Sequence, residues 1–269
     1  MLTAVVGINW GDEGKGRMVD LLSADYDIVC RYQGGNNAGH TVINDYGKIV
    51  LNLLPSGISR EGTVNVMGNG MVIDLEHLVH EIQSLREKGI HIGPDNLKIS
   101  DKAVICLPWH KMQDIMEEDR LKDKKFGSTR RGIGPVYADK YMKKAVRMGD
   151  LFAPDKLPEK VADLTEWKNL TVRGYGHEPV KAEDILAWLH EFGDPIKSYI
   201  TDVSDYLYDA ATAGENIMFE AQLGALRDIE FGIYPYTSSS CTLAGYATIG
   251  AGIPGLKLDK TIGIMKAYS

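Results

Sequence analysis

The chain has 269 residues, of which 44% are hydrophobic and 25% charged, and its formal net charge is -7. This composition predicts a globular protein with one large domain or two small ones. The acidic balance argues against a nucleic-acid surface, and no segment approaches the ~18 apolar residues of a membrane helix. Three widely separated cysteines without metal-ligand spacing favour a reducing compartment. We therefore expect a cytoplasmic protein that binds neither nucleic acid nor a membrane.

The first candidate site is a glycine-rich turn between a predicted strand and a predicted helix. Residues 2–8 are apolar and β-branched, as in a buried strand, and residues 17–22 have helical spacing. Such a turn aims backbone N–H groups and a helix N-terminus at a phosphate. Lys15 stands where a P-loop lysine stands, but Gly16 replaces the hydroxyl residue that holds Mg²⁺ in that pattern. Asp12 is the carboxylate that substitutes for it, and an ordinary tight turn is the alternative interpretation.

The rest of the chain alternates strands and helices. Short apolar runs predict strands at residues 27–32, 64–67, 103–107, 217–220 and 261–265, and a hairpin at residues 41–53. We expect helices after an N-cap at Asp74, at about residues 110–124 with a mostly solvated face, and over residues 151–215, including one that starts at Pro195. This order predicts an α/β fold in one domain over residues 1–269. Its features are a large, mostly parallel central sheet with flanking helices, a helical insertion at about residues 151–215 and a P-loop-like phosphate site.

Polar, glycine-rich loops follow several of the predicted strands. Asn37 and His40 lie in the second loop, Thr129 and Arg131 in the third, and Ser238 in a later hydroxyl-rich segment. Taken singly, these residues are ordinary loop histidines and turn formers. Open α/β sheets bind ligands where their strands end, so together they indicate a phosphorylated ligand with several parts.

These motifs resemble the adenylosuccinate synthetase family, in order and over the whole chain. The resemblance is carried by Trp10-Gly11-Asp12-Glu13-Gly14-Lys15-Gly16, Arg31-Tyr32-Gln33-Gly34-Gly35, Asn37-Ala38-Gly39-His40-Thr41, Arg131-Gly132-Ile133-Gly134-Pro135, Tyr234-Pro235-Tyr236 and Lys266-Ala267-Tyr268-Ser269. It implies a homodimeric enzyme with a large central sheet. That enzyme ligates L-aspartate to IMP on the way to AMP, driven by GTP and one Mg²⁺ ion.

The resemblance also implies roles for individual residues. Asp12 would remove the N1 proton of IMP, and His40 would stabilise the 6-oxyanion as O6 attacks the γ-phosphate of GTP; with Lys15 they form the expected catalytic set. Aspartate then displaces phosphate from 6-phosphoryl-IMP. The expected metal ligands are Asp12 and the carbonyl of Gly39. The expected GTP-binding residues are Gly11, Asp12, Glu13, Gly14, Lys15, Gly16, Gly39, His40 and Thr41. The expected IMP-binding residues are Asp12, Asn37, Ala38, Gly39, His40, Thr129, Lys143, Gln222, Thr237 and Ser238.

Three positions depart from the family pattern. Arg130 stands where glycine is usual, Lys143 replaces an arginine that reaches the IMP phosphate of the partner subunit, and Gln222 is displaced by one residue. The family also continues well beyond residue 269, so we expect this chain to be a fragment of a longer enzyme. Three alternatives stay open. They are a related synthetase acting on deoxyguanylate, which typically lacks an aspartate at the position of Asp12, a nucleotide-binding module without full catalysis, and an unrelated P-loop-like ATPase.

Overall fold

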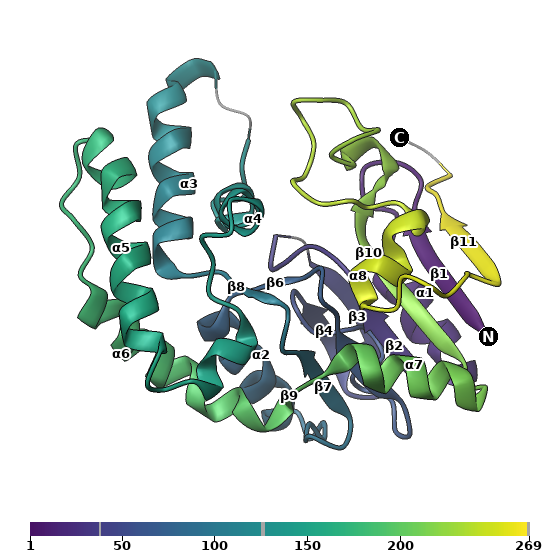
Figure 1. The fold of residues 1–269 in the computed structure, drawn as a ribbon. Coiled ribbons are helices and arrows are strands. Elements are labelled where there is room, and N and C mark those ends of the chain that lie inside the picture. Colours follow the sequence, from purple (N-terminus) through teal and green to yellow (C-terminus); the bar gives the residue numbers. More distant parts are fainter. Residues whose placement is uncertain (38, 125–126, 268–269) are drawn as a thin grey trace.

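A computed structural model describes residues 1–37, 39–124 and 127–267 (Figure 1). The strands are β1 (Leu2–Gly7), β2 (Ile28–Arg31), β3 (His40–Asn44), β4 (Gly47–Leu51), β5 (Val64–Met67), β6 (Val72–Ile73), β7 (Leu97–Ser100), β8 (Val104–Ile105), β9 (Ile200–Thr201), β10 (Ile217–Gly224) and β11 (Lys260–Ile264). The α-helices are α1 (Lys15–Leu22), α2 (Leu75–Glu87), α3 (Pro108–Leu121), α4 (Ile133–Tyr141), α5 (Leu157–Gly174), α6 (Ala182–Gly193), α7 (Val203–Ala213) and α8 (Ala247–Ala251). In these ranges no helix is both long and apolar enough to cross a membrane.

A seven-stranded sheet forms the centre of the described chain. Its strand order is β11-β1-β10-β2-β5-β7-β9, and every neighbouring pair runs parallel. Parallel strands need helical crossovers, which cover both faces of such a sheet. The predicted α/β fold with a mostly parallel sheet is therefore confirmed. The predicted hairpin is present as the antiparallel pair of β3 and β4, and the structure places it outside the central sheet.

The two faces of the sheet bury alternate residues of the same strands. Ala4, Cys30 and Phe219 pack with apolar residues of α7 and α8 on one face, and Val5 and Val29 pack with α1 on the other. This alternation is the two-residue side-chain period of a strand. Because both faces are covered, these strands read as continuous apolar runs in the sequence.

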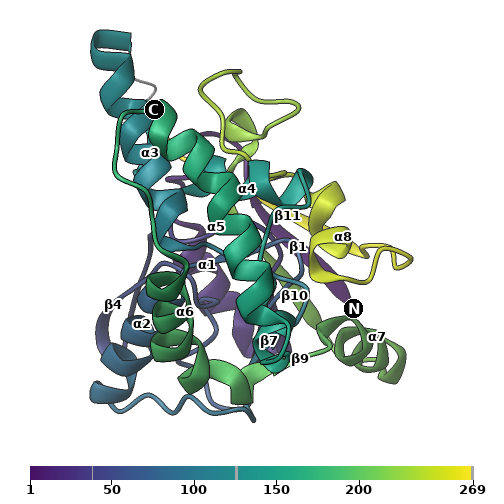
Figure 2. The same cartoon turned by 60° about the vertical axis from the view of Figure 1, so that its left-hand side comes forward.

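A second, larger core joins the helical part to the sheet. It contains buried side chains from α2, α3, α5, α6, the hairpin and β7, including Leu75, Leu97, Trp109, Val161 and Leu189. In Figure 1 the helices α3, α5 and α6 stack on the side of the sheet opposite to β1 and β11, and Figure 2 shows α5 running alongside α3. The helical insertion thus covers one end of the sheet.

The structure corrects four details of the predicted elements. No single helix starts at Pro195, because Ile200 pairs with Ile99 of β7 and Asp202 then caps a separate helix, α7. Helix α3 is not mostly solvated, since Trp109 and His110 are among its buried side chains. Strand β10 continues through Gly224, where a loop was expected. Strand β7 was not predicted, because its short run mixes apolar and polar residues.

Candidate active site

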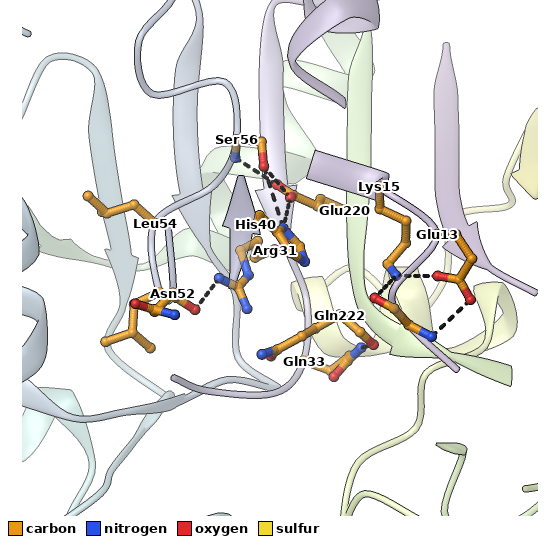
Figure 3. A network of polar contacts seen from close by, with 12 residues as sticks. Glu13, Lys15, Arg31, Gln33, His40, Asn52, Leu54, Ser56, Glu220 and Gln222 are labelled. Carbon is orange, nitrogen blue, oxygen red and sulfur yellow. Dashed lines mark hydrogen bonds and ion pairs between the residues drawn. The ribbon is translucent and has the colours of Figure 1, made fainter. Parts of the chain in front are cut away.

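The turn between β1 and α1 is built to hold negative charge. The backbone N–H groups of Asn9 and Gly11 each donate to the carboxylate of Glu13 over 2.9 Å. The Nζ of Lys15, which is almost fully buried, lies 3.0 Å from the same carboxylate and donates to the carbonyl of Gly11. Burial lowers the pKa of Lys15, and Glu13 opposes that shift. The turn therefore closes around the carboxylate of Glu13 (Figure 3), and the phosphate site expected here stays a prediction.

Gly14 sets the direction in which α1 leaves this turn. It has φ +86° and directly precedes Lys15, the first residue of the helix. A left-handed conformation at this point favours glycine. Gly16 follows in the first helical turn, where a Cβ atom would lie 2.6 Å from the Cβ of His40. The glycine lets the first and second predicted loops touch, so Lys15 and His40 belong to one site.

His40 is the best-defined catalytic candidate. It starts β3 rather than lying in a loop, and its ring is buried. Its Nδ1 lies 2.5 Å from Oε1 of Glu220, and Ser56 donates to Glu220 through both its hydroxyl and its backbone N–H, at 2.6 and 2.8 Å. The Nε2 of His40 has no hydrogen-bond partner among the described residues. Buried polar atoms without a partner are uncommon, so this nitrogen is a candidate for contact with a ligand.

The pKa values of this pair describe its charge state. Burial lowers the pKa of His40, although Glu220 opposes the shift. Burial raises the pKa of Glu220, but His40, Arg31 and Ser56 outweigh that effect, and the net direction is downward. A neutral imidazole therefore faces an ionised carboxylate, and the Nδ1–H of His40 donates to Glu220.

Buried polar side chains extend the network away from His40. The guanidinium of Arg31 donates to the carbonyls of Asn52 and Gly35, at 2.6 and 3.4 Å. Gln33 donates through Nε2 to the carbonyl of Gln222 at 2.6 Å, and Gln222 donates in turn to Gly35 at 2.9 Å. These contacts fix the chain on both sides of the second loop (Figure 3).

Asp12 differs from the other candidates because its carboxylate is 60% exposed. It pairs with Lys266 over 2.5 Å, and this lysine lowers the pKa of Asp12. Within the described ranges no three His, Cys, Asp or Glu side chains gather as a metal cluster. One accessible carboxylate that already attracts a cation fits the way Mg²⁺ binds, with few protein ligands and several phosphate oxygens.

A cavity of about 860 Å³ lies between the helices α3, α4 and α5 and the segment 227–239. Four predicted IMP-binding residues line it: Asn37, Thr129, Thr237 and Ser238. Its size lies within the range of small-molecule pockets. Both hydroxyl or amide residues and apolar residues such as Ile133 line it, a mixture that suits a polar ligand with a flat ring.

Several predicted site residues lie outside the lining of this cavity. Gln222 is fully buried in β10, and its Oε1 has no hydrogen-bond partner among the described residues. Lys143 follows α4 with φ +62° and is exposed, and Thr41 is an exposed residue of β3. Gly39 precedes His40 and is also exposed. Ala38 lies outside the described residues.

Sequence reasoning assigned no role to Glu220 or Ser56. Glu220 is one acidic residue in the otherwise apolar run of residues 217–221, which reads as a buried strand. A carboxylate in such a run was the available signal, because buried charges need partners. Ser56 sits in a Pro-Ser-Gly turn, and its backbone contact with Glu220 has no sequence signal.

Comparisons with known proteins identify the family of this chain. The family model described as adenylosuccinate synthetase matches residues 4–269. The adenylosuccinate synthetase of Ligilactobacillus salivarius is 44% identical over 266 residues, which make up 98% of this chain and 61% of that protein. The enzyme of Caldanaerobacter subterraneus is 43% identical over 269 residues, which make up 100% of this chain and 63% of that protein.

Solved structures give the same result. The fully ligated adenylosuccinate synthetase from Plasmodium falciparum has a TM-score of 0.90 and 35% identity, covering 99% of this chain and 62% of that one. The succinoaminodeoxyadenylate synthetase of cyanophage S-2L, bound to dGMP and dATP, has a TM-score of 0.65 at 20% identity and shares the fold. The match covers 98% of this chain and 63% of that one. This chain thus spans about three fifths of the length of the relatives it matches, and it belongs to the adenylosuccinate synthetase family.

Proposed function

We propose that this protein joins L-aspartate to IMP in the formation of adenylosuccinate, with GTP as the phosphoryl donor. The observation that carries the proposal is the buried ring of His40, whose Nδ1 contacts Glu220 and whose Nε2 has no hydrogen-bond partner in the described part of the chain, next to the turn of Lys15. In the reaction O6 of IMP attacks the γ-phosphorus of GTP and GDP leaves. The amino nitrogen of aspartate then attacks C6 and expels phosphate.

His40 acts on the first of these steps. Its Nδ1–H donates to Glu220, so a neutral ring presents a lone pair at Nε2. A ligand oxyanion near Nε2 favours the protonated ring, because an opposite charge raises the pKa of the histidine. The Glu220 carboxylate then stabilises the imidazolium, which donates to the oxyanion as charge develops.

Asp12 would remove the N1 proton of IMP. Its carboxylate is accessible, and Lys266 lowers its pKa and so keeps it ionised, which is the form that a general base needs. Lys15 and backbone N–H groups of the turn would hold GTP phosphates next to the carboxylate of Glu13. Asn37, Thr129, Thr237 and Ser238 would hold the IMP phosphate and sugar in the cavity.

The proposed metal is one Mg²⁺ ion. The carboxylate of Asp12 and the carbonyl of Gly39 would hold it, together with phosphate oxygens. When bound, the ion neutralises charge on the phosphates and so aids phosphoryl transfer. We further propose a cytoplasmic homodimer in which Lys143 approaches the IMP phosphate of the partner subunit.

The test separates catalysis from binding. Asp12→Ala and His40→Ala should each lower IMP- and aspartate-dependent GTP hydrolysis by at least about 100-fold. The Kd for IMP, measured by titration calorimetry, should stay within about threefold, because the cavity residues are intact. Weakened IMP binding with normal turnover would contradict both roles.

One alternative is a nucleotide-binding module without full catalysis. In that case the wild-type chain binds IMP by calorimetry, but it hydrolyses no GTP when IMP and aspartate are added. A preference for deoxyguanylate over IMP in the same titration would instead favour the related synthetase.

A further inference from the structure

Leu223 holds a backbone conformation that a leucine rarely adopts. Its φ is +63°, and it is one of four non-glycine residues with positive φ in the described chain, with Lys122, Arg130 and Lys143. Among these four, Leu223 alone lines the large cavity. The left-handed region is strained for residues with a Cβ atom, and such strain often accompanies function.

The strain at Leu223 comes from the close approach of the first loop. A Cβ atom on Gly11 would lie 2.4 Å from the Cα of Leu223, and one on Gly7 would lie 2.7 Å from its carbonyl oxygen. The pairing of β1 with β10 also shifts here, from Val5 opposite Glu220 to Gly7 opposite Gly224. Tight packing therefore fixes the backbone, and glycine would be the unstrained residue at this position.

Leu223 lies where the first loop meets the cavity. Its main chain contacts Gly11, and the residue lines the same cavity as Thr129, Thr237 and Ser238. The inference rests on the proposed function, in which the reacting oxygen of the purine must meet a phosphoryl donor held by the first loop. The base therefore faces Leu223, and the nucleotide phosphate faces the hydroxyl groups.

We propose that Leu223 is the apolar contact for the purine ring and determines specificity at the base end of the site. A leucine side chain offers the flat ring a surface without hydrogen-bond demands, which suits the apolar faces of a heteroaromatic base. This contact explains why a side chain is kept where the backbone favours glycine.

The experiment compares Leu223→Ala and Leu223→Gly with the wild-type chain. Both variants should weaken IMP binding by about tenfold in calorimetry, the usual effect of losing a few methylene contacts. The inhibition constant of ribose 5-phosphate, measured by displacement of IMP, should stay within about twofold because that ligand has no base. Leu223→Gly should melt at a higher temperature than Leu223→Ala, since glycine relieves the strain and alanine does not.

Lys122→Gly is the matched control, because it removes another positive-φ side chain (φ +49°) at the end of α3 and outside the cavity lining. Its IMP affinity should equal that of the wild type. Unchanged IMP affinity in both Leu223 variants, or an equal loss of affinity for IMP and ribose 5-phosphate, overturns this inference but leaves the proposed function standing. A wild-type chain that binds no IMP overturns the proposed function and this inference together.

Discussion

At the scale of single residues, the site depends on one buried carboxylate. Glu220 accepts from the ring of His40 and from two donors of Ser56, and Arg31 lies near enough to lower its pKa further. A buried charge is stable only with such partners, since its desolvation costs several kcal/mol. The same contacts fix the ring and leave Nε2 free to face a ligand.

Glu220→Gln should slow turnover without weakening IMP binding. The amide keeps the shape of the carboxylate but removes the charge that stabilises protonated His40. We expect kcat to fall by about 10- to 100-fold while the KM for IMP changes by less than about threefold. Steady-state kinetics across pH 5 to 9 measures both values, and the acidic limb of the profile reports the protonation of His40, whose pKa is lowered by burial.

Ser56→Ala provides the comparison for Glu220→Gln. It removes one hydrogen bond to the same carboxylate but leaves the charge opposite His40. Its loss in kcat should stay below about fivefold, in line with a single hydrogen bond. Equal losses in the two variants, or an unchanged pH profile in Glu220→Gln, would refute the positioning role.

The sequence predicted the residues of the loops better than the buried residues that position them. Lys15, His40 and Thr129 stand in the polar, glycine-rich loops that the sequence indicated for a phosphorylated ligand, and the structure places the first two close together and the third at the cavity. Gln222 was expected at the ligand, but it is buried in β10 and Leu223 lines the cavity instead. A two-residue period cannot locate such a residue where the strand pairing shifts.

At the scale of elements, α3 anchors the third loop. Asp114 accepts from the hydroxyl of Ser128 over 2.6 Å and from the backbone N–H of Gly132 over 2.9 Å. Glu118 accepts from the backbone N–H of Ser128 over 3.2 Å. Both ends of the segment 128–132 are thus tied to one helix, and Thr129 between them lines the cavity.

Asp114→Asn should weaken IMP binding by about tenfold, or roughly 1.4 kcal/mol. An asparagine side chain has one acceptor oxygen, so it replaces one of the two hydrogen bonds and releases one end of the loop. Titration calorimetry with IMP measures the loss, and the melting temperature of the variant reports whether the fold is kept.

Asp119→Asn, on the same helix, is the control for Asp114→Asn. Asp119 forms an exposed ion pair with Arg130 over 3.2 Å, and such pairs contribute little. We expect IMP affinity to change by less than about twofold. If Asp114→Asn binds IMP as the wild type does while Thr129→Val does not, Asp114 does not position the loop.

Elements with a local sequence signal were predicted correctly. The predicted N-cap of α2 is confirmed, since the Asp74 side chain accepts from the backbone N–H of His77. The prediction of a single helix from Pro195 was wrong, because Ile200 pairs with Ile99 of β7. These two residues are about 100 positions apart in the sequence. A local period cannot reveal such a contact.

At the scale of the whole molecule, a buried polar cluster ties the helices α3, α4 and α5 together. The Nε2 of His110 in α3 donates to Asp139 of α4 over 2.9 Å, and Lys168 of α5 lies 2.8 Å from the same carboxylate. The Nδ1 of His110 accepts from the backbone N–H of Leu107 over 2.8 Å. These helices border the cavity, so the cluster supports its wall.

The stability of the protein should fall on acidification because of His110. Burial lowers its pKa, although Asp139 opposes the shift. Below pH ~6.5 the unfolded chain therefore binds a proton on this histidine while the folded chain does not. The free energy of unfolding then decreases as the pH falls, by up to about 1.4 kcal/mol per pH unit.

Urea unfolding at pH 7.5 and 5.5 tests this expectation with His110→Gln. Glutamine can accept from Leu107 and donate to Asp139 but cannot take a proton, so the variant should lose less stability between the two pH values than the wild type. His177→Gln, at an exposed position, should keep the wild-type pH dependence. An equal loss of stability in wild type and His110→Gln would show that other groups govern the acid response, because the change removes only the titrating ring.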